Sequence, residues 1–335
     1  MNLYFNEKYG KLYEKHERAE VVTFVFENEH GKITHMFMKK EIPIKVNNTI
    51  YYDVFTPYGY GGPLILKASN IDQLIRDYQT AFTIYCKKQR IVSEFIRFHP
   101  IENQKMREQF NGQVDYVGPQ IVRDLSDPVE ENISKRTLRY YRRNKHRDIK
   151  TVYDSSGTYL DGFLEIYYST MEKNNAQEYY YFDRQFFENL NIELKDHYVY
   201  VHIFMDDLII ASELILFGET YSYGFLKGTR KGYYEMNPNI NMEIDGIKFL
   251  KEKAIKYYIL GGGHKSEDGI YQFKKKFAEN SDYHYYIGKK THDLKTYEKL
   301  VKIRFNTNAI PQNILFFPAY RAPASHLDTP IFSNN

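Results

Sequence analysis

The sequence predicts an α+β fold with two mixed sheets, each crossed by helices. Three observations predict it: the chain length, the hydrophobic periods and a repeated order of elements. With 335 residues, the chain suits two domains of about 150 residues each. Hydrophobic residues make up 42% and charged residues 27%, which is typical of a globular protein. We therefore expect two packed cores rather than one.

The order of predicted elements repeats over residues 21–122 and 198–287. Each stretch contains a hairpin, a strand, a Gly-containing loop, a long helix, a strand, a short helix and a strand. The halves share this pattern without evident sequence identity, so a coincidence of common elements is the alternative. A hairpin-led mixed sheet with crossover helices is typical of the acetyltransferase (GNAT) fold, here used twice.

In the first half, alternating hydrophobic residues predict strands at 21–26, 33–38, 50–55, 91–98 and 114–122. Residues 1–20 predict a short amphipathic helix. Asn70 can cap a helix that runs to about Lys88, and 101–110 predicts a second, short helix. The Gly- and Pro-rich stretch 56–63 predicts a loop.

In the second half, the same criteria predict strands at 149–153, 198–205, 208–217, 221–226, 257–260 and 283–287. Helices are expected at 124–148, 157–174, 183–195, 238–256, 268–277 and 294–304. Asp183 is the expected cap of one helix, and Asn237 with Pro238 begins another. The expected division is a first domain at 1–125, a basic linker helix at 126–148, a second domain at 149–305 and an irregular tail at 306–335.

Composition excludes several classes of protein. A net charge of +3 gives no global field for stable DNA binding. The single cysteine, Cys86, cannot form an internal disulfide, which fits a reducing compartment. The charged N-terminus lacks a signal-peptide pattern, and no apolar run approaches the roughly 20 residues of a membrane span. We expect a cytoplasmic protein, without a metal site of the HExxH type or a P-loop; the oligomeric state is not indicated.

The most specific stretch joins a strand to a helix through three glycines. The strand ends at Leu260, Gly261–Gly263 and His264 follow, and the helix begins near Asp268. Glycines let a ligand approach the backbone, and a helix N-terminus offers free N–H groups to an anion. Lys274 in this helix could stabilise negative charge on a carbonyl oxygen or phosphate. The alternative is a Gly-rich turn before a surface helix with a solvated lysine.

These residues resemble the C-terminal motif of the Fem-type peptidyltransferases (FemA, FemB and FemX). The resemblance lies in LGGG…DGIYQFKKKF, the following YYIGKK and a final helix with Tyr297. Weaker similarities extend it over roughly 20–305: Gly61-Gly62-Pro63, Phe98-His99-Pro100, the basic segment 134–147, Thr170-Met171-Glu172 and Tyr181-Phe182. The chain lacks the long helical arm of FemA and FemB, so it is more similar to the compact FemX type.

The resemblance implies an enzyme that moves an amino acid from aminoacyl-tRNA to an amine of a peptidoglycan precursor, nucleotide- or lipid-linked. It implicates Lys274 and the adjacent Phe273 in catalysis. An aminoacyl ester is already activated, so positioning and oxyanion stabilisation suffice, with no covalent enzyme intermediate. No tightly bound cofactor is expected. The resemblance also implies a bacterial protein that contacts the inner face of the membrane peripherally.

Two departures from the family pattern affect the acceptor. His99 stands where compact members have an acidic residue, so it is a candidate general base or, alternatively, a structural histidine. The basic residue that meets a nucleotide diphosphate is not found, and the comparable stretch 178–182 is aromatic. Tyr181 there could stack on a sugar or nucleobase or belong to the core. The acceptor therefore stays open between a stem peptide and an amino sugar.

Basic residues offer two candidate phosphate contacts. Five arginines lie on or beside the basic helix and could bind tRNA phosphates or a lipid-linked pyrophosphate: Arg136, Arg139, Arg142, Arg143 and Arg147. A solvated helix face is the alternative. Arg230 and Lys231 precede the helix at 238, where a phosphate could bind. The other candidate substrate-binding residues are Tyr58, Tyr60, Gly61, Gly62, Arg97, Tyr181, Tyr223, Gly261, Gly262, Gly263, His264, Asp268 and Tyr271.

Two other functions remain open. One is an acyl-CoA-dependent N-acyltransferase that acts on an amino sugar of a capsular or other surface polysaccharide. The loop 227–239, KGTRKGYYEMNPN, lacks the glycine spacing of a coenzyme A pyrophosphate loop, which favours tRNA as the donor. The other is a non-enzymatic homologue that binds a glycan precursor or partner protein. The presence of Lys274 beside three glycines argues against it.

Overall fold

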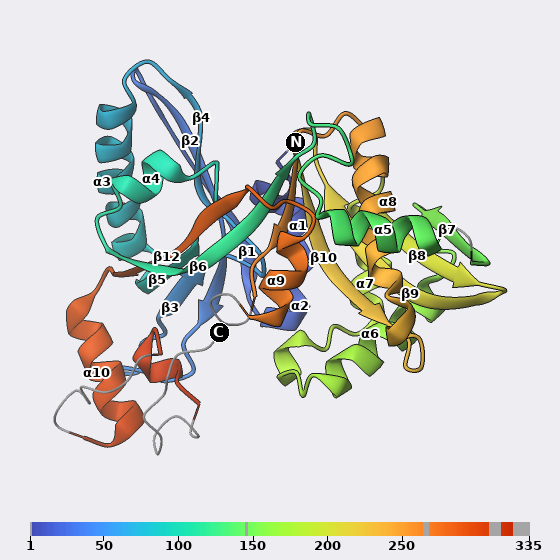
Figure 1. Cartoon of the computed structure of the whole chain (residues 1–335). Coiled ribbons are helices and arrows are strands. Elements are labelled where there is room, and N and C mark those ends of the chain that lie inside the picture. Colours follow the sequence, from blue (N-terminus) through green and yellow to red (C-terminus); the bar gives the residue numbers. More distant parts are fainter. Residues whose placement is uncertain (1, 145–146, 264–267, 308–315, 324–335) are drawn as a thin grey trace. The chain divides into compact units, whose positions relative to one another are not determined.

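A computed structural model describes residues 2–144, 147–263, 268–307 and 316–323 (Figure 1). The chain forms two compact units. The N-terminal unit contains Tyr4–Gly118 together with the chain from His284 onward. The central unit contains Pro119–Tyr283 and the first three residues.

The N-terminal unit is built from a sheet, one long helix and several short helices. Its strands are β1 (Glu20–Asn28), β2 (Gly31–Glu41), β3 (Tyr52–Phe55), β4 (Gly62–Ala68), β5 (Ile91–Arg97), the first part of β6 (Gln113–Asp124) and β12 (Asp282–Thr291). Its helices are η1 (Leu3–Phe5), α1 (Glu7–Lys11), α2 (Glu14–Glu17), α3 (Ile71–Lys88), α4 (Gln104–Glu108), α10 (Leu294–Phe305) and η4 (Ala319–Arg321).

Helix α3 packs its apolar face on this sheet (Figure 1). Asn70 caps the helix by accepting a hydrogen bond from Gln73 N, as its sequence position predicts. Buried Leu74, Phe82 and Cys86 of α3 belong to the same core cluster as Ile33 and Phe37 of β2. Strands β1, β2 and β3 pair antiparallel, β4 pairs with β2, and β3 lies parallel to β5.

The central unit carries the remaining strands, with helices of its own. Its strands are the end of β6, β7 (Ile149–Asp154), β8 (Tyr198–Met205), β9 (Leu208–Phe217), β10 (Tyr221–Thr229) and β11 (Tyr257–Gly261). Its helices are α5 (Lys135–Asn144), α6 (Leu160–Lys173), η2 (Glu178–Tyr180), α7 (Arg184–Glu193), η3 (Tyr234–Met236), α8 (Pro238–Glu252) and α9 (Gly269–Lys275). Strands β7 to β10 pair antiparallel in chain order, and β10 lies parallel to β11.

Each unit therefore repeats one topological step. A helix joins two parallel strands, α3 between β3 and β5, and α8 between β10 and β11. An antiparallel neighbour then follows: β12 pairs with β5, and the end of β6 pairs with β11. This repeat confirms the predicted mixed α+β class, in which the acetyltransferase-like arrangement of two parallel strands and a connecting helix occurs twice. The expected division kept 149–305 together, whereas the chain from His284 belongs to the N-terminal unit.

The local predictions differ from the structure at several places. Residues 1–20 form the short helices η1, α1 and α2 instead of one helix. Strand β4 occupies part of a segment expected to be a loop, because its edge position next to β2 tolerates Pro63. The basic helix is shorter than 124–148, since α5 covers only Lys135–Asn144. Asn237 precedes α8 as expected, but its side chain donates to Glu235 O instead of capping the helix.

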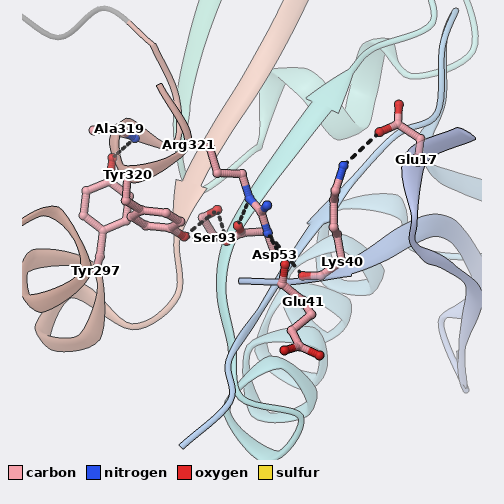
Figure 2. Close-up of polar contacts among 9 residues, drawn as sticks. All are labelled: Glu17, Lys40, Glu41, Asp53, Ser93, Tyr297, Ala319, Tyr320 and Arg321. Carbon is pink, nitrogen blue, oxygen red and sulfur yellow. Dashed lines mark hydrogen bonds and ion pairs between the residues drawn. The ribbon is translucent and has the colours of Figure 1, made fainter. Parts of the chain in front are cut away.

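The described part of the C-terminal segment packs on the N-terminal unit (Figure 2). Arg321 donates from Nε to Asp53 Oδ2 at 2.6 Å and from Nη2 to Glu41 O at 2.8 Å. The Tyr297 hydroxyl of α10 accepts from Ala319 N at 3.0 Å. These residues fix a segment that the sequence indicates only as an irregular tail.

Within the described ranges, the helices are all too short or too polar to cross a lipid bilayer.

Candidate active site

Lys274 lies in the central unit, on the short helix that follows the three glycines. Strand β11 ends at Gly261, whose φ of +83° favours glycine. Asp268 precedes α9 and accepts hydrogen bonds from Ile270 N and Tyr271 N, both at 2.9 Å. This cap fixes the start of the helix and, with it, the position of Lys274 about one and a half turns later.

The Lys274 side chain reaches back to the glycines. Its Nζ donates to Gly262 O at 2.7 Å. A Cβ atom added at Gly261 would lie 3.2 Å from the same Nζ, so glycine leaves the room that the ammonium occupies. Burial lowers the pKa of Lys274 to about 7, and repulsion from Lys227 adds to the effect, while Glu213 and Asp268 oppose it. Both charge states of Lys274 are therefore populated near neutral pH.

Four further residues form a buried ion cluster next to Lys274. We use this name for Glu213 of β9, Lys227 of β10, Glu243 of α8 and Tyr258 of β11. Lys227 Nζ forms ion pairs with Glu213 Oε1, at 3.3 Å, and with Glu243 Oε1. The Tyr258 hydroxyl donates to Glu213 Oε1 at 3.1 Å and lies 3.4 Å from Glu243 Oε2. Both carboxylate side chains are fully buried.

A β-bulge brings the cluster together. The register between β9 and β10 shifts between Gly224 and Leu226, after which Lys227 stands directly opposite Glu213. Residues directly opposite in an antiparallel pair project their side chains to the same face. Helix α8 packs against β9 and adds Glu243 from above this face.

The ion cluster was not predicted from the sequence. A signal was present, because Glu213 lies inside the apolar strand ASELILF and a charge there needs a partner when buried. Its partners come from three other elements, so their identity required the fold.

The helix N-terminus itself does not offer the anion site that we expected. Asp268 already occupies the amides of Ile270 and Tyr271, so a ligand would have to displace a carboxylate. Gly263 lies against the same Asp268, since a Cβ there would lie 2.1 Å from Oδ1. The positive group available at the glycines is therefore the Lys274 ammonium. His264 lies outside the described residues.

The other predicted residues of the central unit have varied surroundings. Phe273 is half-buried, and its ring centre lies 5.8 Å from Lys227 Nζ and 5.5 Å from Lys276 Nζ. Tyr271 and Tyr223 are buried. Phe273 thus lies within cation–π distance of Lys227 and Lys276.

A second feature of the central unit is a cavity of about 180 Å³ where α5 and α8 begin. It is lined by Ser134, Arg136, Thr137, Tyr140, Asn237, Ile240 and Lys276. Two of these residues are cations, and three carry hydroxyl groups. Such a lining suits a phosphate group.

Several of the other predicted phosphate-binding residues already have partners within the protein. The Arg230 guanidinium pairs with Glu165, and its Nε donates to Ile209 O at 2.8 Å, so a phosphate would have to displace these partners. Arg142 pairs with Glu130 at 2.6 Å. Arg143 lies over the Tyr140 ring, with its Cζ 4.7 Å from the ring centre.

Three other basic candidates are exposed: Arg139, Arg147 and Lys231. Tyr181, which directly follows η2 in the chain, is half-buried. Among the predicted phosphate-binding residues, Arg136 lines the cavity at α5 and α8, whereas the loop residues Arg230 and Lys231 do not.

The N-terminal unit holds the other predicted residues, His99 among them. The His99 side chain is buried, and its Nδ1 accepts from Ile101 N at 3.2 Å and Glu102 N at 3.1 Å. Burial lowers the pKa of His99 to about 3. This environment favours the structural histidine over the general base.

Around His99 lie the glycine loop and its aromatic residues. Tyr60 packs against His99, with ring centres 5.6 Å apart, and Tyr58 O accepts from the Tyr9 hydroxyl. Gly62 begins β4, Gly61 forms an isolated β-bridge with Phe98, and Arg97 Nη1 donates to Thr56 O at 3.0 Å. These residues stabilise the loop that precedes β4.

Among the residues that the structure describes, no group of three or more His, Cys, Asp or Glu side chains is placed to hold a metal ion.

No family model matches the chain, and no curated protein matches its sequence. Solved structures do match: a crystal structure of FemX has a TM-score of 0.65 at 14% identity, covering 88% of this chain and 93% of that one. A C-terminal domain (DUF2156) assigned to an Agrobacterium fabrum lysylphosphatidylglycerol synthetase has a TM-score of 0.54 at 11% identity, covering 80% and 84%.

The structure of L-PGS from Bacillus licheniformis has a TM-score of 0.51 at 12% identity and covers 84% of this chain and 92% of that one. At these identities the likeness concerns the fold. Together with the repeated topology, it shows that this chain has the FemX type of fold, in agreement with the resemblance of its sequence motifs.

Proposed function

We propose that the protein is an aminoacyltransferase that moves an amino acid from aminoacyl-tRNA to an amine of a cell-wall precursor. The observation that carries the proposal is the Lys274 ammonium, partly buried at the glycine end of β11 and hydrogen-bonded to Gly262 O. A cation held in such a place can stabilise the charge that develops when an amine attacks an ester carbonyl.

The chemistry needs few groups. The acceptor nitrogen forms a bond to the carbonyl carbon, and the carbonyl oxygen becomes an oxyanion next to Lys274. The ester C–O bond then breaks, and the ribose hydroxyl leaves with the proton that the nitrogen gives up. Positioning of the two reactants and one preorganised cation can together supply most of the rate enhancement of such a transfer.

The cavity at α5 and α8 supports a phosphate-bearing donor. Arg136 and Lys276 line it, in the same unit as Lys274. Backbone phosphates of the tRNA acceptor end would bind such cations in a salt-dependent manner. The pyrophosphate of coenzyme A would suit the same lining, so acyl transfer from coenzyme A to an amino sugar is the second candidate.

The names of similar structures bear on the acceptor. One of them is assigned as a lysylphosphatidylglycerol synthetase, and this name describes a product in which an amino acid is attached to a lipid. This supports an acceptor in the bacterial cell envelope. We further propose that the protein works in the cytoplasm and meets a lipid-linked acceptor at the inner face of the membrane.

The test compares donors directly. Purified protein is mixed with one of two labelled donors, a pool of radiolabelled aminoacyl-tRNAs or acetyl-CoA. Each donor is offered with nucleotide- and lipid-linked peptidoglycan precursors and, separately, with amino-sugar acceptors. Amide product from aminoacyl-tRNA that is lost in Lys274→Met would support the proposal. Lys195→Met is the control, because Lys195 is an exposed lysine of the same unit. Product from acetyl-CoA alone would replace the proposal with the second candidate.

A further inference from the structure

The ion cluster holds two carboxylates but only one lysine. The side chains of Glu213 and Glu243 are fully buried, and Lys227 is the cation between them. Burial raises the pKa of Tyr258 well above 10, so its hydroxyl stays neutral and balances no charge. Two carboxylates against one ammonium leave one negative charge in excess, and buried charge is costly unless it is paired and hydrogen-bonded.

The pairing within the cluster is also incomplete. Among the residues that the structure describes, Glu213 Oε2 receives no hydrogen bond, although it is buried. Lys227 Nζ forms ion pairs with both carboxylates but makes no hydrogen bond of regular geometry. Buried polar atoms without a partner are rare in native proteins and can mark the place of a bound group. The cluster therefore suits a cation whose N–H donors can be directed more freely than those of the tethered Lys227.

We propose that Glu213 and Glu243 bind the α-ammonium group of the aminoacyl donor, and that Lys227 occupies this place with its own ammonium until the donor displaces it. The inference rests on the proposed function and identifies the part of the donor that the central unit recognises.

Lys227 is the member of the cluster that can leave. Its side chain is 23% exposed, whereas both carboxylate side chains are wholly buried. The lysine ammonium ends a flexible stem of four carbons, so it can move out without a change in the strand that carries it. Its departure would open the two carboxylates to an incoming ammonium.

An aromatic ring completes the cation site. Phe273 is half-buried, and its ring centre lies 5.8 Å from Lys227 Nζ. A cation within about 6 Å of an aromatic ring centre is attracted by the negative face of the ring. An ammonium in the place of Lys227 Nζ would keep this contact.

Two elements carry both the cation site and Lys274. Strand β11 contains Tyr258 and ends at the glycines that Lys274 contacts. Helix α9 contains Phe273, which Lys274 directly follows. The charges of Lys227 and Glu213 also act on the pKa of Lys274. Because one carbon atom separates the α-ammonium of an aminoacyl ester from its carbonyl carbon, an ammonium held here would direct the carbonyl towards Lys274.

The charge of the site favours the donor over the acceptor as its occupant. Nearby carboxylates stabilise the protonated form of an amine. An acceptor amine must lose a proton before it attacks, whereas the α-ammonium of the donor takes no part in the bond changes. An acetyl group has no ammonium, so the site would also distinguish aminoacyl-tRNA from acetyl-CoA.

The first test needs no transfer reaction. Lys227→Ala leaves the two carboxylates without their cation, and ethylammonium can replace the lost end of the side chain. Ethylammonium chloride should raise the unfolding temperature of Lys227→Ala by several degrees more than sodium chloride does at equal ionic strength, because a ligand stabilises the state that binds it. The double variant Lys227→Ala/Glu243→Gln should lose this difference. Equal shifts with the two salts in Lys227→Ala would overturn the inference.

The second test compares a pool of aminoacyl-tRNAs with the same pool after N-acetylation of the α-amine. Filter binding to the wild type should favour the free ammonium by about tenfold or more, since hydrogen bonds to charged groups are strong. Glu243→Gln should reduce the preference to about threefold or less and still fold, because Lys227 and Glu213 remain as a balanced pair. Glu252→Gln is the matched control, at an exposed glutamate of the same helix, and should keep the full preference.

The two tests separate the inference from the proposed function. Equal binding of the free and acetylated tRNAs by the wild type, or a preference that Glu243→Gln leaves unchanged, would overturn the inference and leave the proposed function standing. Binding of neither tRNA would refute the proposed function and the donor as occupant, while an ethylammonium effect would still show the cation site. If Lys227→Ala does not fold, the comparison of the wild type with Glu243→Gln decides.

Discussion

The Tyr320 hydroxyl donates to Asp53 Oδ1 at 2.5 Å and thereby joins the C-terminal segment to the middle of the N-terminal sheet. Ser93 Oγ of β5 donates to the same oxygen at 2.7 Å, and Arg321 Nε binds the other oxygen. Figure 2 shows the carboxylate surrounded by these three donors. A buried charge is tolerated there because every oxygen has partners from well-separated parts of the chain.

Removing the Tyr320 hydroxyl should destabilise the protein. Burial raises the pKa of Tyr320, so the group stays protonated and donates. A hydrogen bond to a charged group contributes about 1.5–3 kcal/mol, and Tyr320→Phe should lower the free energy of unfolding by that amount. Urea denaturation followed by circular dichroism measures it. Tyr116→Phe, at a 53% exposed tyrosine, is the control, and equal stabilities of the two variants would contradict the prediction.

The sequence could not predict this anchor, although it did predict most of the elements. Asp53, Ser93 and Tyr320 lie 40 or more residues apart, and no local periodicity links them. Helix caps behave differently, because they depend on residues three positions apart. Asp183 and Asn70 could therefore be identified from the sequence and are confirmed as caps.

The candidate site shows the same limit. The strand, the three glycines and Lys274 all lie within residues 257–274, so the sequence alone indicates them as a unit. Lys227, Glu213 and Glu243 meet only because a bulge sets the register of β10 and α8 packs over it. The sequence also did not predict that the end of β6 pairs with β11 or that β12 pairs with β5. The reason is the same, since periodicity identifies a strand but not its partner.

The Lys274 amine should make stability depend on pH. Its folded pKa of about 7 lies below the ordinary value of 10.5, so between these values the unfolded chain binds more protons. Stability from this group therefore rises with pH from about 7 to 10, by less than about 1.4 kcal/mol per pH unit. We expect the free energy of unfolding of the wild type, minus that of Lys274→Met, to increase across pH 7, 8 and 9 in urea titrations. A constant difference would mean that Lys274 titrates normally.

Adding a methyl group at Gly261 should disturb Lys274 specifically. Gly261→Ala strains a backbone with φ +83° and places Cβ 3.2 Å from Lys274 Nζ. Gly232→Ala is a matched control, because its φ is +94° but nothing lies within 4 Å of the added Cβ. Both variants should lose about 1 kcal/mol of stability. Transfer activity should fall about tenfold or more only in Gly261→Ala, since small displacements of catalytic groups have large effects. Equal activities would place Lys274 outside the reaction.

Arg136 and Arg142 should differ in their effect on donor binding. Arg136 lines the cavity at α5 and α8, whereas Arg142 pairs with Glu130 at the surface. If tRNA phosphates bind in the cavity, Arg136→Gln should weaken tRNA binding and lower the slope of log affinity against log salt by about 1. Arg142→Gln should change both by much less. Filter binding at four salt concentrations measures them, and equal effects of the two variants would argue against the cavity as the donor site.

His99 should prove important for stability and not for proton transfer. Its Nδ1 accepts two backbone N–H groups, and its pKa of about 3 lies far below the ordinary 6.5. Between pH 3 and 6.5 the unfolded chain binds more protons at His99 than the folded protein does. The stability that His99 contributes is therefore lost as pH falls from 6.5 towards 3. His99→Asn supplies an amide oxygen that can accept the same N–H groups, and we expect weaker acid destabilisation together with transfer activity within about threefold of wild type. Loss of a general base would instead lower kcat by about 10²–10⁴. A folded His99→Asn protein with such a loss would show that His99 takes the acceptor's proton, which its buried position and backbone partners otherwise oppose.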